Sequence, residues 1–583
     1  MRKKLRIGLT AGVLMLALSP ALRLSANPGP GKGDDDKRNS KKGIRHVLLI
    51  SIDGMHAVDF ENCIASNTCP TLAALGHTGV NYTRTTTSRP SDSFPGLMSI
   101  VTGGSPKTVG AFYDVAYDRV LAPPASDTGN GLVHGNCNAG MINGTQTEYE
   151  EGVEIDQTKV NGGGPYSTFD GGVLSIDPKK LERDPFNGCN PVYPWNFIRT
   201  NTIYGVIHAA GRFTAWSDKH PVYAAVSGPT GTSSPSNVDD YYAPEVNSNV
   251  INIPGFKTAN GKDCSNISAN TSGDWTTDFD SIKCYDQLKV NAVVNWINGK
   301  NHRGNASAPV PAIFGMNFQA VSVGEKLIEN GVKGGYTNAA GDPTPSMLAE
   351  IEFVDAAIGQ MAAALKQNNL LDSTAIIITS KHGQSPIDTN RFFPIPGHSG
   401  TNGMPPSQIL AALLPVAETT GLGPTEDDIS QLWLNHSSDT LTAVGMLEAN
   451  AKEAGIGQIF YGASLETMFN APGVPTTPGP CCRLREGGDP RTPDIIVAPN
   501  VGVVYTGSAK KQSEHGGFAH DDTNVILLVS NPDIRAHTVT SFVETAQVAP
   551  TILQLLGLDP QDLDAVRQEG TPVLPGLFES DHD

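Results

Sequence analysis

The chain has 583 residues, among them 62 glycines and 42 prolines, and its formal net charge is −18. That charge argues against generic nucleic-acid binding and against adhesion to anionic membranes. It leaves room for an anionic substrate, because a local cation or a helix terminus can outweigh the global field.

The first 26 residues have the features of a secretory signal peptide. A basic segment at residues 2–6 precedes an apolar run at 7–18, and Leu24-Ser25-Ala26 resembles a cleavage site. The run is too short to span a bilayer, and no later run is long enough. We therefore expect a secreted or periplasmic protein with a signal peptide at 1–26, a disordered linker at 27–45 and one large domain at 46–583.

The first predicted strand is the apolar run 46–52, which ends at Asp53 and Gly54. A short, nearly continuous apolar run is typical of a buried parallel strand. Ligands of open α/β sheets bind at the carboxyl ends of the strands, so Asp53 is a candidate ligand residue. The alternative is that Asp53 only caps a helix.

Ser93 precedes a short apolar segment that opens with Pro95 and ends at Gly103. Proline favours the first turn of a helix and glycine often follows the last turn, so Ser93 is predicted at or just before a helix N-terminus. Free backbone N–H groups and the positive end of the helix dipole suit a phosphate there. An ordinary serine N-cap is the alternative interpretation.

The rest of the chain alternates strand-like and helical segments. Further strands are expected at Ile203–Ile207, Ala312–Phe318, Thr374–Thr379, Asp494–Ala498 and Asn524–Val529. Helices are expected at Ser346–Gln367, where apolar residues follow a 4,3 spacing, and near Thr545–Leu556, which starts or kinks at Pro550. A helix followed at once by a strand is half of a parallel crossover unit. The pattern predicts an α/β fold, with insertions at about 121–190 and 420–480 that shape substrate access.

All eight cysteines follow the signal segment, and an even number in an exported chain predicts disulfides. Pairing between near neighbours would join Cys63 to Cys69, Cys137 to Cys189 and Cys264 to Cys284. The adjacent Cys481 and Cys482 could bind each other or distant partners. The sequence has no Cys-x-x-Cys motif, which argues against a zinc–thiolate cluster.

Six ordered segments resemble the alkaline phosphatase superfamily, and in particular its type I phosphodiesterase/nucleotide pyrophosphatase branch. They are LLISIDG (48–54), SFPGLMSIVTG (93–103), WSDKHP (216–221), IIITSKHG (376–383), EHGGFAHDDTNV (514–525) and VAPTILQLLGL (548–558). The resemblance implies a large, mostly parallel sheet sandwiched between helices. It also implies a serine or threonine nucleophile, two metal ions that are usually zinc, and a phospho-enzyme intermediate.

The resemblance assigns roles to four residues. Ser93 matches the nucleophile, and Asp53, His382 and Ser93 itself match ligands of the metal that activates it. His515 matches a ligand of the second metal. A divalent cation would lower the pKa of the Ser93 hydroxyl, and the helix N-terminus would hold the phosphoryl oxygens.

Two departures from the family pattern concern the metals. Lys381 stands where the family has an aspartate ligand, and a protonated lysine cannot coordinate a metal. Gln319 and Val323 stand where the family has an aspartate and a histidine of the second site. The sequence therefore favours one ion, zinc, over two, with Lys381 as a catalytic residue that supplies charge. Asp521 and Asp522 are possible replacement ligands or simple local caps.

The function expected from these residues is a secreted, metal-dependent phosphoester hydrolase that acts on a small-molecule substrate, without a nucleic-acid-binding module or a membrane span. One alternative is a non-catalytic exported protein that binds oxyanions on the same fold. Another is a single-metal enzyme of the sulfatase or phosphonate-ester hydrolase kind. The oligomeric state is left open.

Overall fold

The computed structural model describes residues 43–129, 131–149, 154–159, 172–248, 250–268, 274–419, 422–465 and 489–578. The predicted signal peptide, nearly all of the predicted linker and the cysteines Cys481 and Cys482 lie outside these residues. Among the residues described, every helix is too short or too polar to cross a bilayer.

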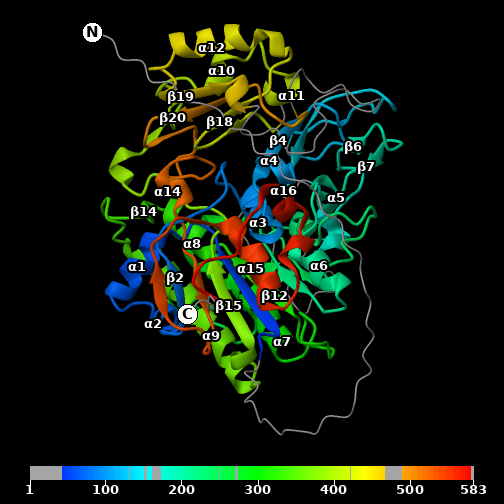
Figure 1. Cartoon of the computed structure of the whole chain (residues 1–583). Helices are drawn as coiled ribbons and strands as arrows, with labels where there is room; N and C mark the ends of the chain where they lie inside the picture. The colour runs from blue at the N-terminus through cyan, green and yellow to red at the C-terminus, as the bar shows by residue number, and fades with distance from the viewer. Residues whose placement is uncertain are drawn as a thin grey trace, which may run out of the picture. The chain divides into compact units, whose positions relative to one another are not determined.

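The core of the fold is one large sheet, which within the described residues has eight strands in the order β23-β2-β22-β15-β1-β12-β8-β9 (Figure 1). The strands are β1 (His46–Ile52), β2 (Gly79–Tyr82), β8 (Ala215–Ser217), β9 (Asp240–Tyr242), β12 (Ile313–Phe318), β15 (Thr374–Thr379), β22 (Leu528–Ser530) and β23 (His537–Val539). β15, β1, β12, β8 and β9 are parallel neighbours, whereas β22 is antiparallel to both β15 and β2. The predicted large, mostly parallel sheet is confirmed.

Helices cover both faces of this sheet, because alternate residues of β1 point to opposite sides. Leu48, Ile50 and Ile52 pack in one core cluster with residues of α7 (Phe279–Ile297), α8 (Ala320–Lys326) and α9 (Pro345–Gln367). Val47 and Leu49 pack in a second cluster with residues of α3 (Ser93–Thr102), α6 (Ile203–Ala209) and α15 (Val548–Leu555). A strand that is buried on both faces reads as a continuous apolar run, which explains the clear signal at 46–52.

Most predicted elements occur within a residue or two of their expected bounds. The predicted helix near Thr545–Leu556 starts as a short 3-10 turn at Thr545–Gln547 and continues as α15, with Pro550 in its first turn. The predicted strand at 524–529 is shorter, since only Leu528–Ser530 pair as β22.

The strand predicted at Ile203–Ile207 is wrong, because these residues form helix α6. Thr202 caps the helix by accepting a hydrogen bond from the backbone N–H of Gly205 at 3.3 Å. The buried residues Ile203, Tyr204 and Ile207 follow the spacing of one helix face, so packing on the core selects the helix.

A second, smaller sheet is formed by β17 (Thr425–Glu426), β18 (Ser430–Leu432), β20 (Ile495–Pro499) and β19 (Ile456–Tyr461) (Figure 1). It packs with α10 (Pro406–Ile409) and α12 (Thr440–Ala449) around its own cluster of leucines and valines. The strand predicted at Asp494–Ala498 is confirmed as β20, and it belongs to this sheet rather than to the large one.

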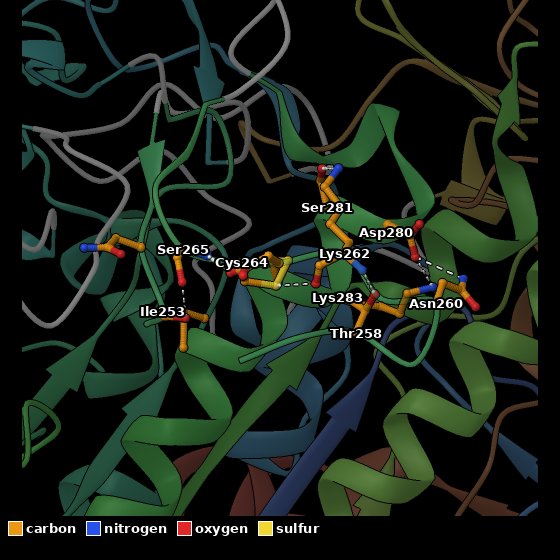
Figure 2. The surroundings of a disulfide bond; sticks show 12 residues. Ile253, Thr258, Asn260, Lys262, Cys264, Ser265, Asp280, Ser281 and Lys283 are labelled. Atoms are coloured by element: carbon orange, nitrogen blue, oxygen red, sulfur yellow. Dashed lines mark hydrogen bonds and ion pairs between the residues drawn. A yellow bond between two sulfur atoms is a disulfide. The ribbon is translucent and has the colours of Figure 1, made fainter. Parts of the chain in front are cut away.

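Three disulfides lie within the described part of the chain, and they are the three pairs expected from near-neighbour spacing. They join Cys63 to Cys69, Cys137 to Cys189 and Cys264 to Cys284. Cys264–Cys284 fastens the segment before α7 to the second turn of that helix, beside Lys262 and Ser281 (Figure 2). Such bonds persist in oxidising compartments.

Candidate active site

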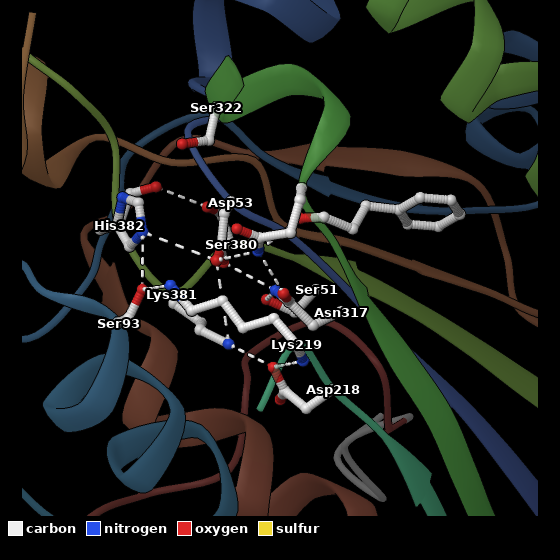
Figure 3. Close-up of polar contacts among 12 residues, drawn as sticks. Ser51, Asp53, Ser93, Asp218, Lys219, Asn317, Ser322, Ser380, Lys381 and His382 are labelled. Atoms are coloured by element: carbon white, nitrogen blue, oxygen red, sulfur yellow. Dashed lines mark hydrogen bonds and ion pairs between the residues drawn. The ribbon is translucent and has the colours of Figure 1, made fainter. Parts of the chain in front are cut away.

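The candidate site lies at the carboxyl ends of four neighbouring strands, β15, β1, β12 and β8. These strands are parallel, so their carboxyl ends meet at one edge of the sheet. The side chains brought together there are Asp53 after β1, Asp218 and Lys219 after β8, Asn317 and Gln319 at the end of β12, and Lys381 and His382 after β15 (Figure 3). All are buried.

Ser93 is the first residue of α3 and faces this group from outside the sheet, as Figure 3 shows. Its Oγ lies 3.2 Å from His382 Nε2 and accepts a hydrogen bond from Lys219 Nζ at 3.1 Å. His382 Nδ1 lies 3.0 Å from the Gly383 carbonyl oxygen. That carbonyl can only accept, so Nδ1 carries the hydrogen and Nε2 is left to accept the hydroxyl hydrogen of Ser93. Burial, and then repulsion from His515, lower the pKa of His382 to about 4, so the ring is neutral at neutral pH.

Asp53 is held by two side-chain amides. Asn317 Nδ2 donates to Asp53 Oδ1 and Gln319 Nε2 donates to Asp53 Oδ2, each at 2.7 Å. Burial acts to raise the pKa of Asp53, but attraction to Lys381 and then to His382 outweighs it, and the pKa lies well below its ordinary value. Asp53 is therefore ionised.

Two buried lysines complete the site. Lys381 Nζ lies 3.0 Å from Asp218 Oδ1, 3.8 Å from Asp53 Oδ2 and 4.2 Å from the centre of the Tyr223 ring. Lys219 belongs to the WSDKHP segment, which contributes to the family resemblance but for which no catalytic role was predicted. A charged Asp-Lys pair directly after an apolar strand was the available signal, but nothing in a single sequence shows that β8 is a neighbour of β12.

His515 lies at the outer side of the site. Its Nδ1 is 3.1 Å from Asp92 Oδ1, and its ring centre is 4.0 Å from that of His382. It also lines a polar pocket of about 200 Å³, together with Lys326, Lys511 and the segment Pro424–Asp427 of the smaller sheet. The insertion predicted at about 420–480 thus contributes a wall of a pocket beside the site. The parts of it at 420–421 and 466–480 lie outside the described residues.

The two possible replacement ligands have local roles. Asp522 Oδ2 accepts a hydrogen bond from the backbone of Ala519 at 3.1 Å, at the start of the short helix α14 (His520–Thr523). Asp521 Oδ2 accepts one from the backbone of Ile387 at 3.0 Å. Asp522 therefore caps the start of α14, and Asp521 anchors the loop at Ile387.

The residues of the site do not fit the zinc ion that the resemblance implies. Asp53, Ser93 and His382 do meet, but Lys219 Nζ is 3.1 Å from Ser93 Oγ, so a cation about 2 Å from that oxygen would face an ammonium of like charge. His515 is the sole ligand left of the second site, because Val323 is buried in the apolar core. Across the described ranges, no group of three or more His, Cys, Asp or Glu side chains could hold a metal ion.

Gly96 allows α3 to approach the loop that carries Lys381 and His382. A Cβ at this position would lie 2.2 Å from the Lys381 carbonyl oxygen, which is a backbone atom and cannot rotate away. Gly96→Ala is therefore expected to lower the free energy of unfolding by about 2–3 kcal/mol. Gly445 in α12 has no heavy atom within 4 Å of such a Cβ. Gly445→Ala, the matched control, should raise it by about 0.5–1 kcal/mol. Urea denaturation followed by circular dichroism measures both, and equal stability of Gly96→Ala and wild type would contradict the close contact.

Comparison with protein families matches residues 47–137 and 334–522 to the model described as type I phosphodiesterase / nucleotide pyrophosphatase. Comparison with curated protein sequences finds no match. Among solved structures, murine ectonucleotide pyrophosphatase/phosphodiesterase 5, as an inactive variant in complex with AMP, has a TM-score of 0.50 at 14% identity. The alignment covers 89% of this chain and 99% of the murine one. The same murine protein without AMP gives the same values, and the human protein gives a TM-score of 0.48 at 14% identity, over 89% of this chain and 99% of its own.

The ordered segments, the sheet and the family match agree. Asp53, Ser93 and His382, which were expected to act together, come from three separate segments and meet at one sheet edge. The chain belongs to the type I phosphodiesterase/nucleotide pyrophosphatase family of the alkaline phosphatase superfamily, whose members hydrolyse phosphoesters.

Proposed function

We propose that this chain is an exported phosphodiesterase that uses Ser93 as its nucleophile and forms a covalent intermediate, in which Ser93 Oγ is bonded to phosphorus that still carries the second alcohol of the substrate. The observation that carries the proposal is the position of the Ser93 hydroxyl, which lies between His382 Nε2 and Lys219 Nζ at the first residue of a helix. A base on one side and a cation on the other are what a serine needs in order to attack at neutral pH.

The first step transfers the phosphoryl group to the protein. The hydroxyl proton of Ser93 passes to His382 Nε2 while Oγ forms a bond to phosphorus and the bond from phosphorus to the leaving oxygen breaks. That oxygen leaves as an alcohol or phenol after it takes up the proton. The backbone N–H groups at the start of α3 and the ammonium of Lys219 face the oxygens on which charge develops.

The second step releases the product. A water molecule attacks the phosphorus of this Ser93 ester, which still carries the second alcohol of the substrate, the bond to Ser93 Oγ breaks, and a proton from the water returns to that oxygen through His382. Overall, one phosphodiester and one water give one alcohol and one phosphate monoester. Both steps use only residues of this chain.

The substrate is proposed to be a small phosphoester that enters past His515. Ser93 has no exposed surface, whereas His515 is 7% exposed and lines the polar pocket. The three disulfides support export.

Trapping of the intermediate tests this function. The full chain is mixed with bis(4-nitrophenyl) phosphate, quenched in acid within seconds and digested, and the peptide that contains Ser93 is examined by mass spectrometry. We expect release of 4-nitrophenol and a 4-nitrophenyl phosphate group on Ser93. Turnover without that phosphate would overturn the assignment of the nucleophile. Binding of phosphate without turnover of any ester would indicate the oxyanion-binding alternative instead.

A further inference from the structure

We propose that the ammonium groups of Lys219 and Lys381 supply the positive charge that this site needs, and that hydrolysis proceeds without a divalent cation. The inference rests on the proposed function and adds Lys219 to its catalytic residues. It differs from what the family resemblance implies, because it gives two lysines the electrostatic task that metal ions perform there.

Lys219 is the cation that touches the nucleophile. Its Nζ donates to Ser93 Oγ at 3.1 Å, and its side chain is 4% exposed. An ammonium in a buried site interacts strongly with a neighbouring oxyanion, because the surroundings screen the charge weakly. Lys219 therefore stabilises the Ser93 oxygen as its proton leaves, and later the same oxygen when it becomes the leaving group.

Lys381 neutralises negative charge among the buried carboxylates near the nucleophile. It joins the two carboxylates of the site, 3.0 Å from Asp218 and 3.8 Å from Asp53. Two carboxylates thus face two ammonium groups, and the group is electrically balanced as it stands. A divalent cation added to it would leave two positive charges buried without partners, which is costly.

The hydrogen bonds of Asp53 also support a site that works without a metal ion. Each of its oxygens accepts a hydrogen bond from an amide, and those amides belong to Asn317 and Gln319. These contacts satisfy the carboxylate and hold it 3.7 Å from His382 Nε2, where it can stabilise the imidazolium that forms when Ser93 loses its proton.

Metal binding tests the inference without reference to activity. Zinc is titrated into the chelator-treated full chain by isothermal calorimetry. We expect no stoichiometric binding by the wild type. The double variant Lys219→Met/Lys381→Asp removes one ammonium and replaces the other with a carboxylate next to Asp53 and His382, and should bind about one equivalent. Saturable binding of zinc by the wild type in a ratio of about one, with heat absent in Ser93→Ala or Asp53→Asn, would overturn the inference.

Kinetics separates the two proposals. With bis(4-nitrophenyl) phosphate, turnover by the wild type should be unchanged by EDTA. Lys219→Met should lower kcat by about 100-fold or more, and Lys219→Arg should recover part of the loss because it keeps the charge. Lys283→Met is the matched control, since Lys283 is equally buried but pairs with Glu350, away from the site, and it should change kcat by less than about threefold.

The outcomes are distinct. If EDTA abolishes turnover and zinc restores it, the inference is wrong while the assignment of Ser93 as nucleophile stands. If Lys219→Met keeps full activity, Lys219 has no catalytic role. If neither turnover nor a covalent phosphoryl ester on Ser93 is found with or without added zinc, the proposed function itself fails.

Discussion

Ser93→Ala is expected to lower kcat for phosphodiester hydrolysis by a factor of about 1,000 or more, because no other hydroxyl replaces the attacking oxygen. The variant should fold, since Ser93 contributes only its contacts with Lys219 and His382, and the loss of such hydrogen bonds costs about 1 kcal/mol. Steady-state rates with bis(4-nitrophenyl) phosphate measure the first effect and thermal unfolding the second.

Ser99→Ala is the matched control for this experiment. Ser99 belongs to the same helix and is also buried, and its Oγ has no hydrogen-bond partner within the part of the chain that the structure describes. Removal of an unsatisfied buried hydroxyl does not cost stability, so Ser99→Ala should keep wild-type activity and be at least as stable. Equal rates for Ser93→Ala and Ser99→Ala would rule out Ser93 as the nucleophile.

Asp218→Asn is expected to have the largest effect on stability, a loss of about 3–5 kcal/mol in the free energy of unfolding. Asp218 Oδ1 lies 3.0 Å from Lys381 Nζ and accepts the backbone N–H of Lys219 at 2.8 Å, while Oδ2 accepts Trp216 Nε1 at 2.9 Å. An amide in its place leaves two buried ammonium groups with only one carboxylate, Asp53. Denaturation in urea measures the loss.

A double-mutant cycle shows whether charge is the cause. Lys381→Met removes the ammonium that Asp218→Asn leaves without its partner, so the double variant should lose less stability than the two single losses added together. The exposed pair Lys257–Asp263, 3.6 Å apart, provides the comparison, and Asp263→Asn should cost less than about 1 kcal/mol. A cost of Asp218→Asn as small as that would show that the buried charges are not coupled as the structure indicates.

The parts of the fold that were predicted from sequence are those with strong local signals. The strands at 46–52 and 374–379 are apolar throughout because helices cover both faces of the sheet. The position of Ser93 at the start of α3 follows from the proline and glycine that flank its helix. At Ile203–Ile207 the apolar run is too short to separate a strand from a helix, and contact with the core decides the outcome.

The site residues that stand in a recognisable sequence motif were predicted. Those that reach the site only because of the order of the strands in the sheet were not. Asp53, Ser93 and His382 were identified because each stands in a motif of the family. Lys219 and Asn317 carry no local signature of a catalytic or supporting role. They reach the site because β8 and β1 both pair with β12, and a single sequence does not show which strands are neighbours.

One side of the pocket next to His515 is formed by the smaller sheet. Asp53, Lys219 and His382 follow strands of the large sheet and Ser93 starts α3, whereas Pro424–Asp427 on one side of the pocket belongs to or adjoins the smaller sheet. If the proposed function is right, the rim of the pocket and the reacting groups are encoded in separate stretches of the gene. Substitutions in the rim at 424–427 could then change which ester enters the site, while the residues proposed to break the ester bond stay the same.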